Sequence, residues 1–286
     1  MNKGICKILE SVYGQEVQIQ SASPIEGGCI NQASALMLTN GERVFLKQNH
    51  HPPKDFFTAE AKGLKLLAQA VGGPKIPQPL AWQDSFLILE YIEESTPGPD
   101  FFIHFAQSLA ELHKVSQNSF GLDHDNYIGN TPQKNVPTDN GLDFFRDQRL
   151  GVQQELARKT GKLPKNIDKK LSKVCDRLEH YLDISGEKPA LLHGDLWSGN
   201  YFSDREQTPC IFDPAVYFGL READLAMTEL FGKLPQRFYE AYHEAFPLNS
   251  GYEERKDLFN LYHLINHLNL FGSSYLSSVE NVLNKY

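Results

Sequence analysis

The segment LLHGDLWSGNYFSDREQTPCIFDPA, residues 191–215, constrains the fold of this chain more than any other. Within it Asp195 follows an apolar run, Asn200 comes five residues later, and Asp213 follows the strand-like residues 210–212. Phosphoryl transfer needs an acid that accepts the proton of an attacking hydroxyl, and oxygen ligands that hold Mg²⁺ against nucleotide phosphates. Asp195 suits the first role, and Asn200 and Asp213 suit the second. The segment therefore favours a fold in which these strand ends converge on one site.

The same segment has an alternative explanation that involves no chemistry. Gly, Asp and Asn are the commonest turn formers, so His-Gly-Asp and Ser-Gly-Asn could be ordinary loop turns. A kinase-like site can be distinguished from such turns because it requires several further parts, all upstream and in a fixed order. Each of these parts can be sought in the sequence.

Two of the required parts are a strand lysine within reach of nucleotide phosphates and an acid on the following helix that holds this lysine. Lys47 in RVFLKQN and Glu60 in FFTAEAKGL occupy such positions. Taken alone, each residue is more often a solvated surface residue. Their order along the chain is what favours the functional interpretation.

The other two parts are a glycine-bearing loop between the first two strands and a connector whose backbone can pair with adenine. Gly27 and Gly28 in SPIEGGCINQAS supply the loop, where backbone amides can approach phosphate. Glu90, Tyr91 and Ile92 supply the connector. Because every part occurs in the required order, we favour a kinase-like site over a chance set of turns.

The hydrophobic pattern predicts an α+β chain with two lobes, a small sheet-containing lobe at residues 1–92 and a larger, mostly helical lobe at residues 93–286. In the first lobe it predicts helices at 5–12 and 55–71, strands at 16–22, 32–38, 44–46, 80–82 and 86–91, and a hairpin turn at Asn40-Gly41. In the second it predicts helices at 102–113, 142–159, 167–182 and from 235 onward, with a long loop at 118–142.

Composition excludes several classes of partner. The net charge is −8 and there is no long basic run, which argues against nucleic acid. The four cysteines are scattered without a Cys-x-x-Cys pair, which favours reduced thiols in the cytosol. The N-terminal residues do not resemble a signal peptide, and no apolar run approaches the ~20 residues of a membrane span. We therefore expect a cytoplasmic protein without a membrane partner, and the oligomeric state cannot be inferred.

The chain resembles the fructosamine kinase (ketosamine 3-kinase) family, a branch of the aminoglycoside phosphotransferase and protein-kinase-like superfamily, over nearly its whole length. His-Gly-Asp with an Asn five residues on is shared by the superfamily. Trp197, the sequence Asp-Asn-Tyr-Ile-Gly at 125–129, and Asp-Pro-Ala followed by Tyr217-Phe218-Gly219 narrow the resemblance to this family. Phe218 is a small departure, because another tyrosine is common there.

The resemblance implies a bilobal protein-kinase-like fold with ATP and Mg²⁺ in the cleft between the lobes. It also implies phosphorylation of the carbon-3 hydroxyl of ketoamines, such as fructosamine or ribulosamine adducts of lysine, free or on glycated proteins, which initiates deglycation. By this resemblance Asp195 is the proton acceptor, and Asn200 and Asp213 hold Mg²⁺. Lys47 with Glu60 positions the phosphates, and residues 90–92 face adenine. His193, Trp197, Asp125 and Tyr127 become candidates for sugar contacts, since aromatic faces and polar groups suit a polyhydroxyl ligand. For Trp197 a core role is an equal alternative.

Two further hypotheses concern single residue types. Cys29 lies in the proposed phosphate loop, where a stabilised thiolate could make it a redox switch, although a small residue chosen to fit a tight loop is the favoured explanation. His50-His51, or His263 with His267 at helical spacing, could bind zinc. No acidic or cysteine partners cluster near either pair in the sequence, so a structural or substrate-side role is favoured.

Two other functions stay open at this point. A kinase for choline, homoserine or an aminoglycoside would share the spacing of Asp195 and Asn200 but not Trp197. A catalytically silent nucleotide-binding regulator would usually lack the lysine, the base or a metal ligand, and all of these are present in this sequence.

Overall fold

A five-stranded antiparallel sheet lies in the N-terminal part of the chain, in a computed structural model that describes residues 2–25 and 30–286. In spatial order its strands are β1 (Ile19–Ile25), β2 (Gln32–Leu38), β3 (Arg43–Gln48), β5 (Phe86–Glu90) and β4 (Pro79–Gln83). The turn between β2 and β3 confirms the predicted hairpin, since Gly41 adopts φ +89° there.

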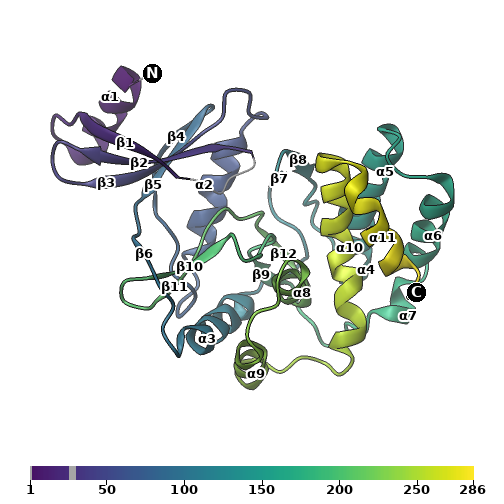
Figure 1. Cartoon of the computed structure of the whole chain (residues 1–286). Coiled ribbons are helices and arrows are strands. Elements are labelled where there is room, and N and C mark those ends of the chain that lie inside the picture. The colour runs from purple at the N-terminus through teal and green to yellow at the C-terminus, as the bar shows by residue number, and fades with distance from the viewer. Residues whose placement is uncertain (1, 26–29) are drawn as a thin grey trace.

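Each face of this sheet packs against a helix (Figure 1). Successive side chains of a strand point to opposite faces, so β5 buries Ile88 with α1 (Asn2–Tyr13) and Leu87 and Leu89 with α2 (Phe56–Leu67). α2 ends before the predicted residue 71, because the next residues close short turns and the Val71 side chain is exposed. The sheet thereby gives Lys47 on β3 a rigid position beneath α2.

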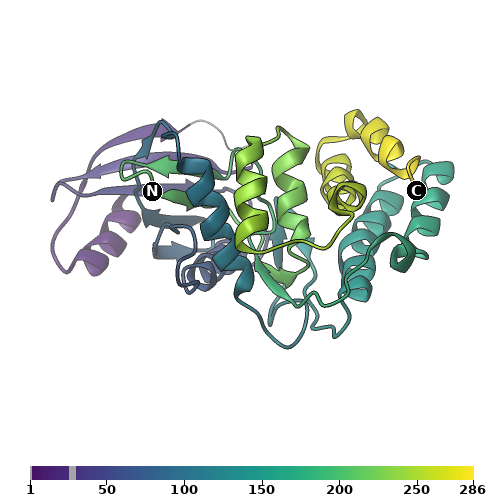
Figure 2. The same ribbon diagram turned by 90° about the horizontal axis from the view of Figure 1, so that it is seen from below.

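The C-terminal part is mostly helical and lies beside the sheet lobe (Figures 1 and 2). Its helices are α3 (Phe101–Lys114), α4 (Gly141–Phe144), α5 (Val152–Lys159), α6 (Lys165–Cys175), α7 (Leu178–Tyr181), α8 (Glu222–Leu230), α9 (Gln236–Ala245), α10 (Tyr252–Phe271) and α11 (Leu276–Leu283). The π-helical η1 (Phe145–Gly151) joins α4 to α5, and the 3₁₀ turn η2 (Ser273–Tyr275) precedes α11. The predicted helix at 167–182 is interrupted between α6 and α7. No helix in the described ranges is both long and apolar enough to span a membrane.

The C-terminal part also contains short strands. β9 (Ala190–Leu192) pairs with β12 (Tyr217–Gly219), and β10 (Tyr201–Asp204) pairs with both β11 (Pro209–Ile211) and β6 (Glu94–Ser95). The α+β class predicted from the sequence is confirmed. The lobe boundary at residues 92 and 93 stays a prediction.

The segment 118–142, predicted as a long loop, is more ordered than expected. It contains a hairpin of β7 (Asn126–Ile128) and β8 (Thr131–Gln133). The Asn126 side-chain nitrogen donates to the Val216 carbonyl oxygen at 2.7 Å, and that of Gln133 donates to the Ala215 carbonyl oxygen at 3.0 Å. These partners are distant in sequence, so local composition could not indicate the hairpin.

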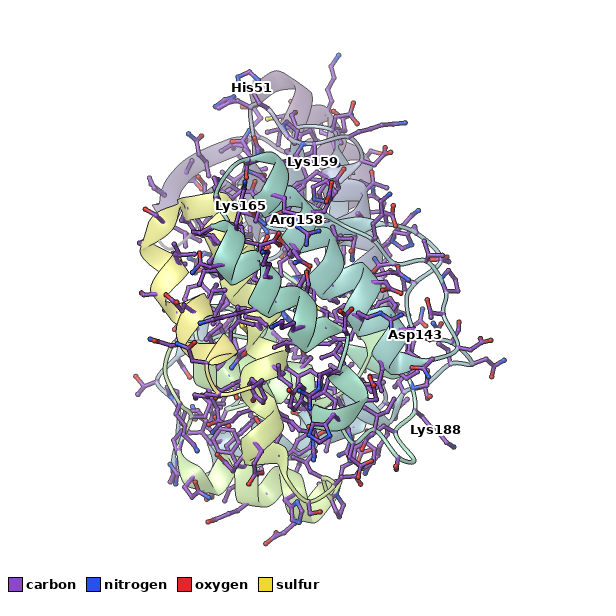
Figure 3. All side chains as sticks on the ribbon, turned by 90° about the vertical axis from the view of Figure 1, so that its right-hand side faces the viewer. His51, Asp143, Arg158, Lys159, Lys165 and Lys188 are labelled. Atoms are coloured by element: carbon purple, nitrogen blue, oxygen red, sulfur yellow. The ribbon has the colours of Figure 1, made fainter. Side chains whose placement is uncertain are left out.

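The outer face of the helical lobe carries many charged side chains (Figure 3). Arg158 and Lys159 lie on α5 and Lys165 begins α6, and the Arg158 guanidinium donates to Asp168 on α6 at 2.7 Å. Exposed ion pairs contribute only about 0–1 kcal/mol each. We assign no functional site to this face.

A close approach of two backbones fixes the loop that follows β9. The Ala215 amide donates to the His193 carbonyl oxygen at 2.9 Å, which brings residues 213–215 against the His-Gly-Asp segment. Gly194 between them has φ +82°, and a Cβ at this position would lie 2.1 Å from the Ala215 carbonyl oxygen. Only glycine combines easy access to a positive φ with the absence of a Cβ, so only glycine fits this position.

Replacing Gly194 with Ala should therefore destabilise the protein far more than the same change at Gly186. Gly186 also has positive φ, +77°, but nothing lies within 4 Å of its Cβ position. We expect Gly186→Ala to cost about 1–2 kcal/mol, from backbone conformation alone. Gly194→Ala should cost more than about 4 kcal/mol, or prevent folding. Urea denaturation measures both, and equal costs would contradict the close approach.

Candidate active site

A cleft of about 930 Å³ lies between the sheet and the helical part of the chain. It brings together residues predicted from distant parts of the sequence. From the N-terminal part, Lys47, Glu60 and residues 90–92 line it; from the C-terminal part, Asp195, Asn200 and Asp213 line it.

The Lys47 ammonium joins three segments at the back of this cleft. Its Nζ donates to Glu60 Oε1 on α2 at 2.7 Å and to Asp213 Oδ1 at 2.7 Å. Lys47 is only 4% exposed. A buried charge is costly unless it is paired, and here two carboxylates accompany it. Burial alone would lower the pKa of Lys47, but the two acids raise it and keep the ammonium charged. Burial and the nearby Asp213 raise the pKa of Glu60 to about 7, against the opposing effect of Lys47.

The nitrogen and the oxygen of the Asn200 side-chain amide have different surroundings. Its side-chain Nδ2 donates to the Asp195 carbonyl oxygen at 2.8 Å, which closes the turn from Asp195 to Asn200. This leaves its Oδ1 for another partner. Asp213 uses Oδ1 for Lys47 and has a half-exposed side chain at φ +57°, an uncommon conformation for a residue other than glycine.

Asp195 is in an acidic environment. About 22% of its side-chain surface still faces the cleft, yet burial by the surrounding protein and the carboxylates of Asp213 and Asp224 raise its pKa to about 8. The ring nitrogen Nδ1 of His263 on α10 lies 3.9 Å from Asp195 Oδ1. Burial lowers the pKa of His263 to about 3, so this ring provides no compensating charge. A cation brought into the cleft would relieve the repulsion among the carboxylates.

His193 is fully buried behind the loop and does not line the cleft. Its Nε2 contacts the Phe212 carbonyl oxygen at 2.9 Å and its Nδ1 accepts from the Asp195 amide at 3.2 Å, which fixes a neutral tautomer with hydrogen on Nε2. Burial lowers its pKa in agreement with that neutral form. In this arrangement His193 has no free face for the sugar contact that we expected; it supports the loop from behind.

Asp224 on α8 holds the same loop and was not identified from the sequence as a functional residue. Its two carboxylate oxygens accept hydrogen bonds from the His193 amide at 2.7 Å and the Gly194 amide at 2.8 Å. Burial would raise the pKa of Asp224, but the hydrogen bond and charge of His113 together with these contacts lower it overall. Its position among apolar residues in READLAM was the available signal, since an acid on a buried helix face requires partners.

The other three residues predicted to contact the sugar do not all lie in the cleft. Trp197 lines the cleft, with its ring 6.4 Å from that of Phe231. Tyr127 also lines the cleft, and its hydroxyl donates to the Lys54 carbonyl oxygen at 2.8 Å. Asp125 does not: its carboxylate accepts from Lys134 Nζ at 2.5 Å and from the Asn135 amide, two residues after β8, at 3.0 Å.

Gly27, Gly28 and Cys29 lie outside the described residues, so the proposed phosphate loop and redox switch stay predictions. Ile25 and Ile30, on either side of this segment, both line the cleft. No cluster of three or more His, Cys, Asp or Glu side chains in residues 2–25 and 30–286 could hold a metal. The structure therefore lends no support to zinc at the histidine pairs.

Comparison with known proteins gives consistent results along the whole chain. The model of the fructosamine kinase family matches residues 1–286. A probable ketoamine kinase of Synechocystis is 40% identical over 98% of this chain and 94% of its own length. A chloroplastic protein-ribulosamine 3-kinase of Arabidopsis thaliana is 36% identical over 96% of this chain and 84% of its own length.

Solved structures agree with these relatives. A crystal structure from Thermobifida fusca that carries the name fructosamine-3-kinase superposes with a TM-score of 0.88 at 32% identity, over 98% of this chain and 97% of the other. A mutant aminoglycoside phosphotransferase, APH(4)-Ia, superposes with a TM-score of 0.62 at 15% identity, over 98% of this chain and 97% of the other. The second likeness shows the fold alone, and it confirms the predicted kinase-like architecture.

Removal of the Lys47 charge should strongly destabilise the protein. In Lys47→Met the carboxylates of Glu60 and Asp213 lose their shared cation, and breaking a buried ion pair on one side costs about 3–5 kcal/mol. Lys54→Met is the matched control, because the Lys54 side chain is almost fully exposed. Chemical denaturation of both variants compares their free energies of unfolding. Equal stability of the two variants would contradict the role given to this ion pair.

The contribution of Asp224 should depend on pH. A carboxylate whose pKa is lowered by folding contributes stability above its unfolded pKa, near 3.9, and that contribution is lost as the pH falls through the folded pKa. Asp224→Asn should lower the free energy of unfolding at pH 7 by about 1.5–3 kcal/mol. The difference from the unchanged protein should shrink below about pH 4. Denaturation curves from pH 3 to pH 7 test this, and a difference that grows on acidification would contradict it.

Proposed function

The chain belongs to the fructosamine kinase family, and from that membership we propose that it transfers a phosphoryl group from ATP to the carbon-3 hydroxyl of ketoamines. The observation that supports this most is the meeting of Lys47, Glu60 and Asp213 with Asp195 and Asn200 in one cleft. Fructosamine or ribulosamine adducts of lysine, free or on glycated proteins, are the expected acceptors.

The positions of the nucleotide-side residues support the roles that we propose for them. Lys47, held by Glu60, faces the cleft as a fixed positive charge for nucleotide phosphates. Residues 90–92 line the cleft beyond β5, where their backbone can pair with adenine. Gly27 and Gly28 complete the phosphate site in this proposal.

The residues also fit a magnesium ion held by Asn200 and Asp213. Asn200 Oδ1 and Asp213 Oδ2 have no hydrogen-bond partner in the described part of the chain, and both are oxygen donors, which Mg²⁺ prefers. Two protein ligands suffice, because Mg²⁺ usually keeps water and phosphate oxygens as its other ligands. When bound, the ion supplies positive charge that stabilises the transferred phosphoryl group and offsets the carboxylates of the cleft.

Asp195 is the proposed proton acceptor. As the acceptor hydroxyl attacks the terminal phosphorus, its O–H bond breaks, the proton passes to a carboxylate oxygen of Asp195, and the bond to the ADP oxygen breaks. The hydrogen bond from Asn200 and the support of Asp224 behind the loop hold Asp195 in position for this transfer.

The rival functions differ in what they require. A kinase for choline, homoserine or an aminoglycoside would use the same nucleotide side with another acceptor. The match of the family model over residues 1–286 favours ketoamines. A silent regulator would not need an intact set of charged groups, and here Lys47, Asp195, Asn200 and Asp213 are all present and share the cleft. A cytoplasmic location and a monomeric or oligomeric state stay open.

The decisive test combines a substrate panel with one variant. Phosphate transfer from ATP should occur to fructosyl- and ribulosyl-lysine, and not to choline or aminoglycosides. Asp195→Asn should lower kcat by at least about 10²–10⁴ with little change in the affinity for ATP, since only proton transfer is removed. Asp123→Asn, whose side chain is 88% exposed, is the control and should keep full activity. Full ketoamine phosphorylation by Asp195→Asn would overturn the mechanism.

A further inference from the structure

Five aromatic rings line the acceptor side of the cleft and have no role in phosphoryl transfer as described above. They come from the loop after β9, the end of α8, the last two turns of α10, and η2. We call these five rings the aromatic wall: Trp197, Phe231, His267, Phe271 and Tyr275. Of the phenylalanines that the structure describes, only two are exposed, Phe271 (49%) and Phe231 (38%), and both belong to this wall. Such exposure of large rings beside a cleft marks a binding surface.

The rings of the wall are arranged around His267. Its ring centroid lies 4.9 Å from that of Phe231, 5.3 Å from that of Phe271 and 5.0 Å from that of Tyr275. Trp197 extends the wall toward Asp195, with its ring 6.4 Å from that of Phe231 at an interplanar angle of 83°. Several ring faces and edges thus converge on one part of the cleft. Burial lowers the pKa of His267, which keeps this central ring uncharged near pH 7.

The charges of the cleft favour a cation in this place. Five carboxylate residues line it in the described part of the chain: Glu60, Glu90, Glu94, Asp195 and Asp213. Lys47 is the only lysine or arginine among the described lining residues, and two of these acids already hold it. A cleft whose one described lysine is already paired, with aromatic rings at its acceptor side, is suited to a positively charged group, because aromatic faces attract cations.

We propose that the aromatic wall is the subsite for the protonated amine of the acceptor, and that it selects ketoamines whose nitrogen carries a plain alkyl chain, as on a glycated lysine side chain. The proposal rests on the proposed function. In a ketoamine the nitrogen is bonded to carbon 1, two carbons from the hydroxyl that reacts. With that hydroxyl at Asp195, the ammonium lies only a few bonds away, on the side where Trp197 begins the wall. A carboxylate next to the nitrogen would meet ring faces that carry negative charge density, which disfavours it.

The test compares two acceptors that differ only in the group attached to carbon 1. The first is 1-deoxy-1-propylamino-fructose, with a secondary ammonium, and the second is the corresponding 1-O-propyl ether of fructose, which is neutral. The ratio of their kcat/KM values measures the preference for the ammonium over the neutral ether. We expect the unchanged protein to favour the amine by about 3- to 30-fold, the range of a desolvated cation–π contact. A third acceptor, the ketoamine of glycine, carries a carboxylate beside its nitrogen and should be poorer than the propylamine compound.

Variants then locate the preference in the wall. Phe271→Leu keeps an apolar side chain but removes the ring, and should bring the amine-to-ether ratio close to one; Phe271→Tyr keeps the ring and should retain the ratio. Phe102→Leu is the matched control, since Phe102 lies on α3 and does not line the cleft. Because Phe271 is half exposed, its replacement should leave the melting temperature almost unchanged, which separates an effect on the subsite from an effect on folding.

The outcomes distinguish this inference from the function on which it rests. If the unchanged protein phosphorylates neither fructose derivative nor any other ketoamine, the proposed function fails and the subsite falls with it. If it phosphorylates the amine and the ether equally well, or if Phe271→Leu keeps the full preference for the amine, the function stands and the subsite is wrong. A ratio that falls in Phe271→Leu and persists in Phe271→Tyr and Phe102→Leu supports the subsite.

Discussion

The buried ammonium of Lys47 is the interaction on which the rest of the site depends. It takes one carboxylate from α2, Glu60, and another from Asp213, so one charge aligns β3, a helix and a loop of the C-terminal part. Removing a charge from water is costly, and this arrangement is stable only when the partners stand at hydrogen-bond distance. The same contact therefore links the folding of the N-terminal sheet to the position of a residue more than a hundred and sixty places along the chain.

Behind the cleft, polar side chains hold the backbone of the two loops that carry Asp195 and Asp213. Asp224 binds the amides of the first loop, and Asn126 and Gln133 bind the carbonyls of the second. Arg149, in the π-helical segment, is fully buried with its guanidinium 3.8 Å from the Tyr217 ring centroid, and it donates to the Lys134 carbonyl oxygen and the Asn135 side-chain oxygen just after β8. Hydrogen bonds in the protein interior are stronger than in water, so these contacts fix the backbone of the loops firmly.

The sequence predicted what depends on local pattern and on order along the chain. The hairpin around Gly41, the neighbouring strands at 80–82 and 86–91, the position of Lys47 on a strand and the α+β class all follow from periodicity and turn chemistry. The site candidates Lys47, Glu60, Asp195, Asn200 and Asp213 were found from their order, and the fold brings them to one cleft. Their catalytic roles still await experiment.

What the sequence did not predict depends on contacts between distant segments. The β7–β8 hairpin was hidden by a loop-like composition, because its side chains bond to residues 215 and 216. His193 resembled a sugar ligand until its two ring nitrogens were seen to be occupied. For Asp224 the available signal was its position among apolar residues in READLAM. The hairpin and Asp224 act through partners far along the chain, whereas His193 is held by the nearby Asp195 amide and Phe212 carbonyl oxygen, contacts that form only once the loop has folded.

The pairing of β6 with β10 has a mechanical consequence. Immediately after the connector at 90–92, Glu94 and Ser95 join the C-terminal hairpin, and Lys75 adds backbone hydrogen bonds to Pro209 and Ile211 and an ion pair to Asp204. Two segments of the chain, at Lys75 and at β6, are therefore attached to the β10–β11 hairpin, one before and one after the connector in sequence. The hairpin thus restrains the connector backbone from both of its ends at this edge of the cleft.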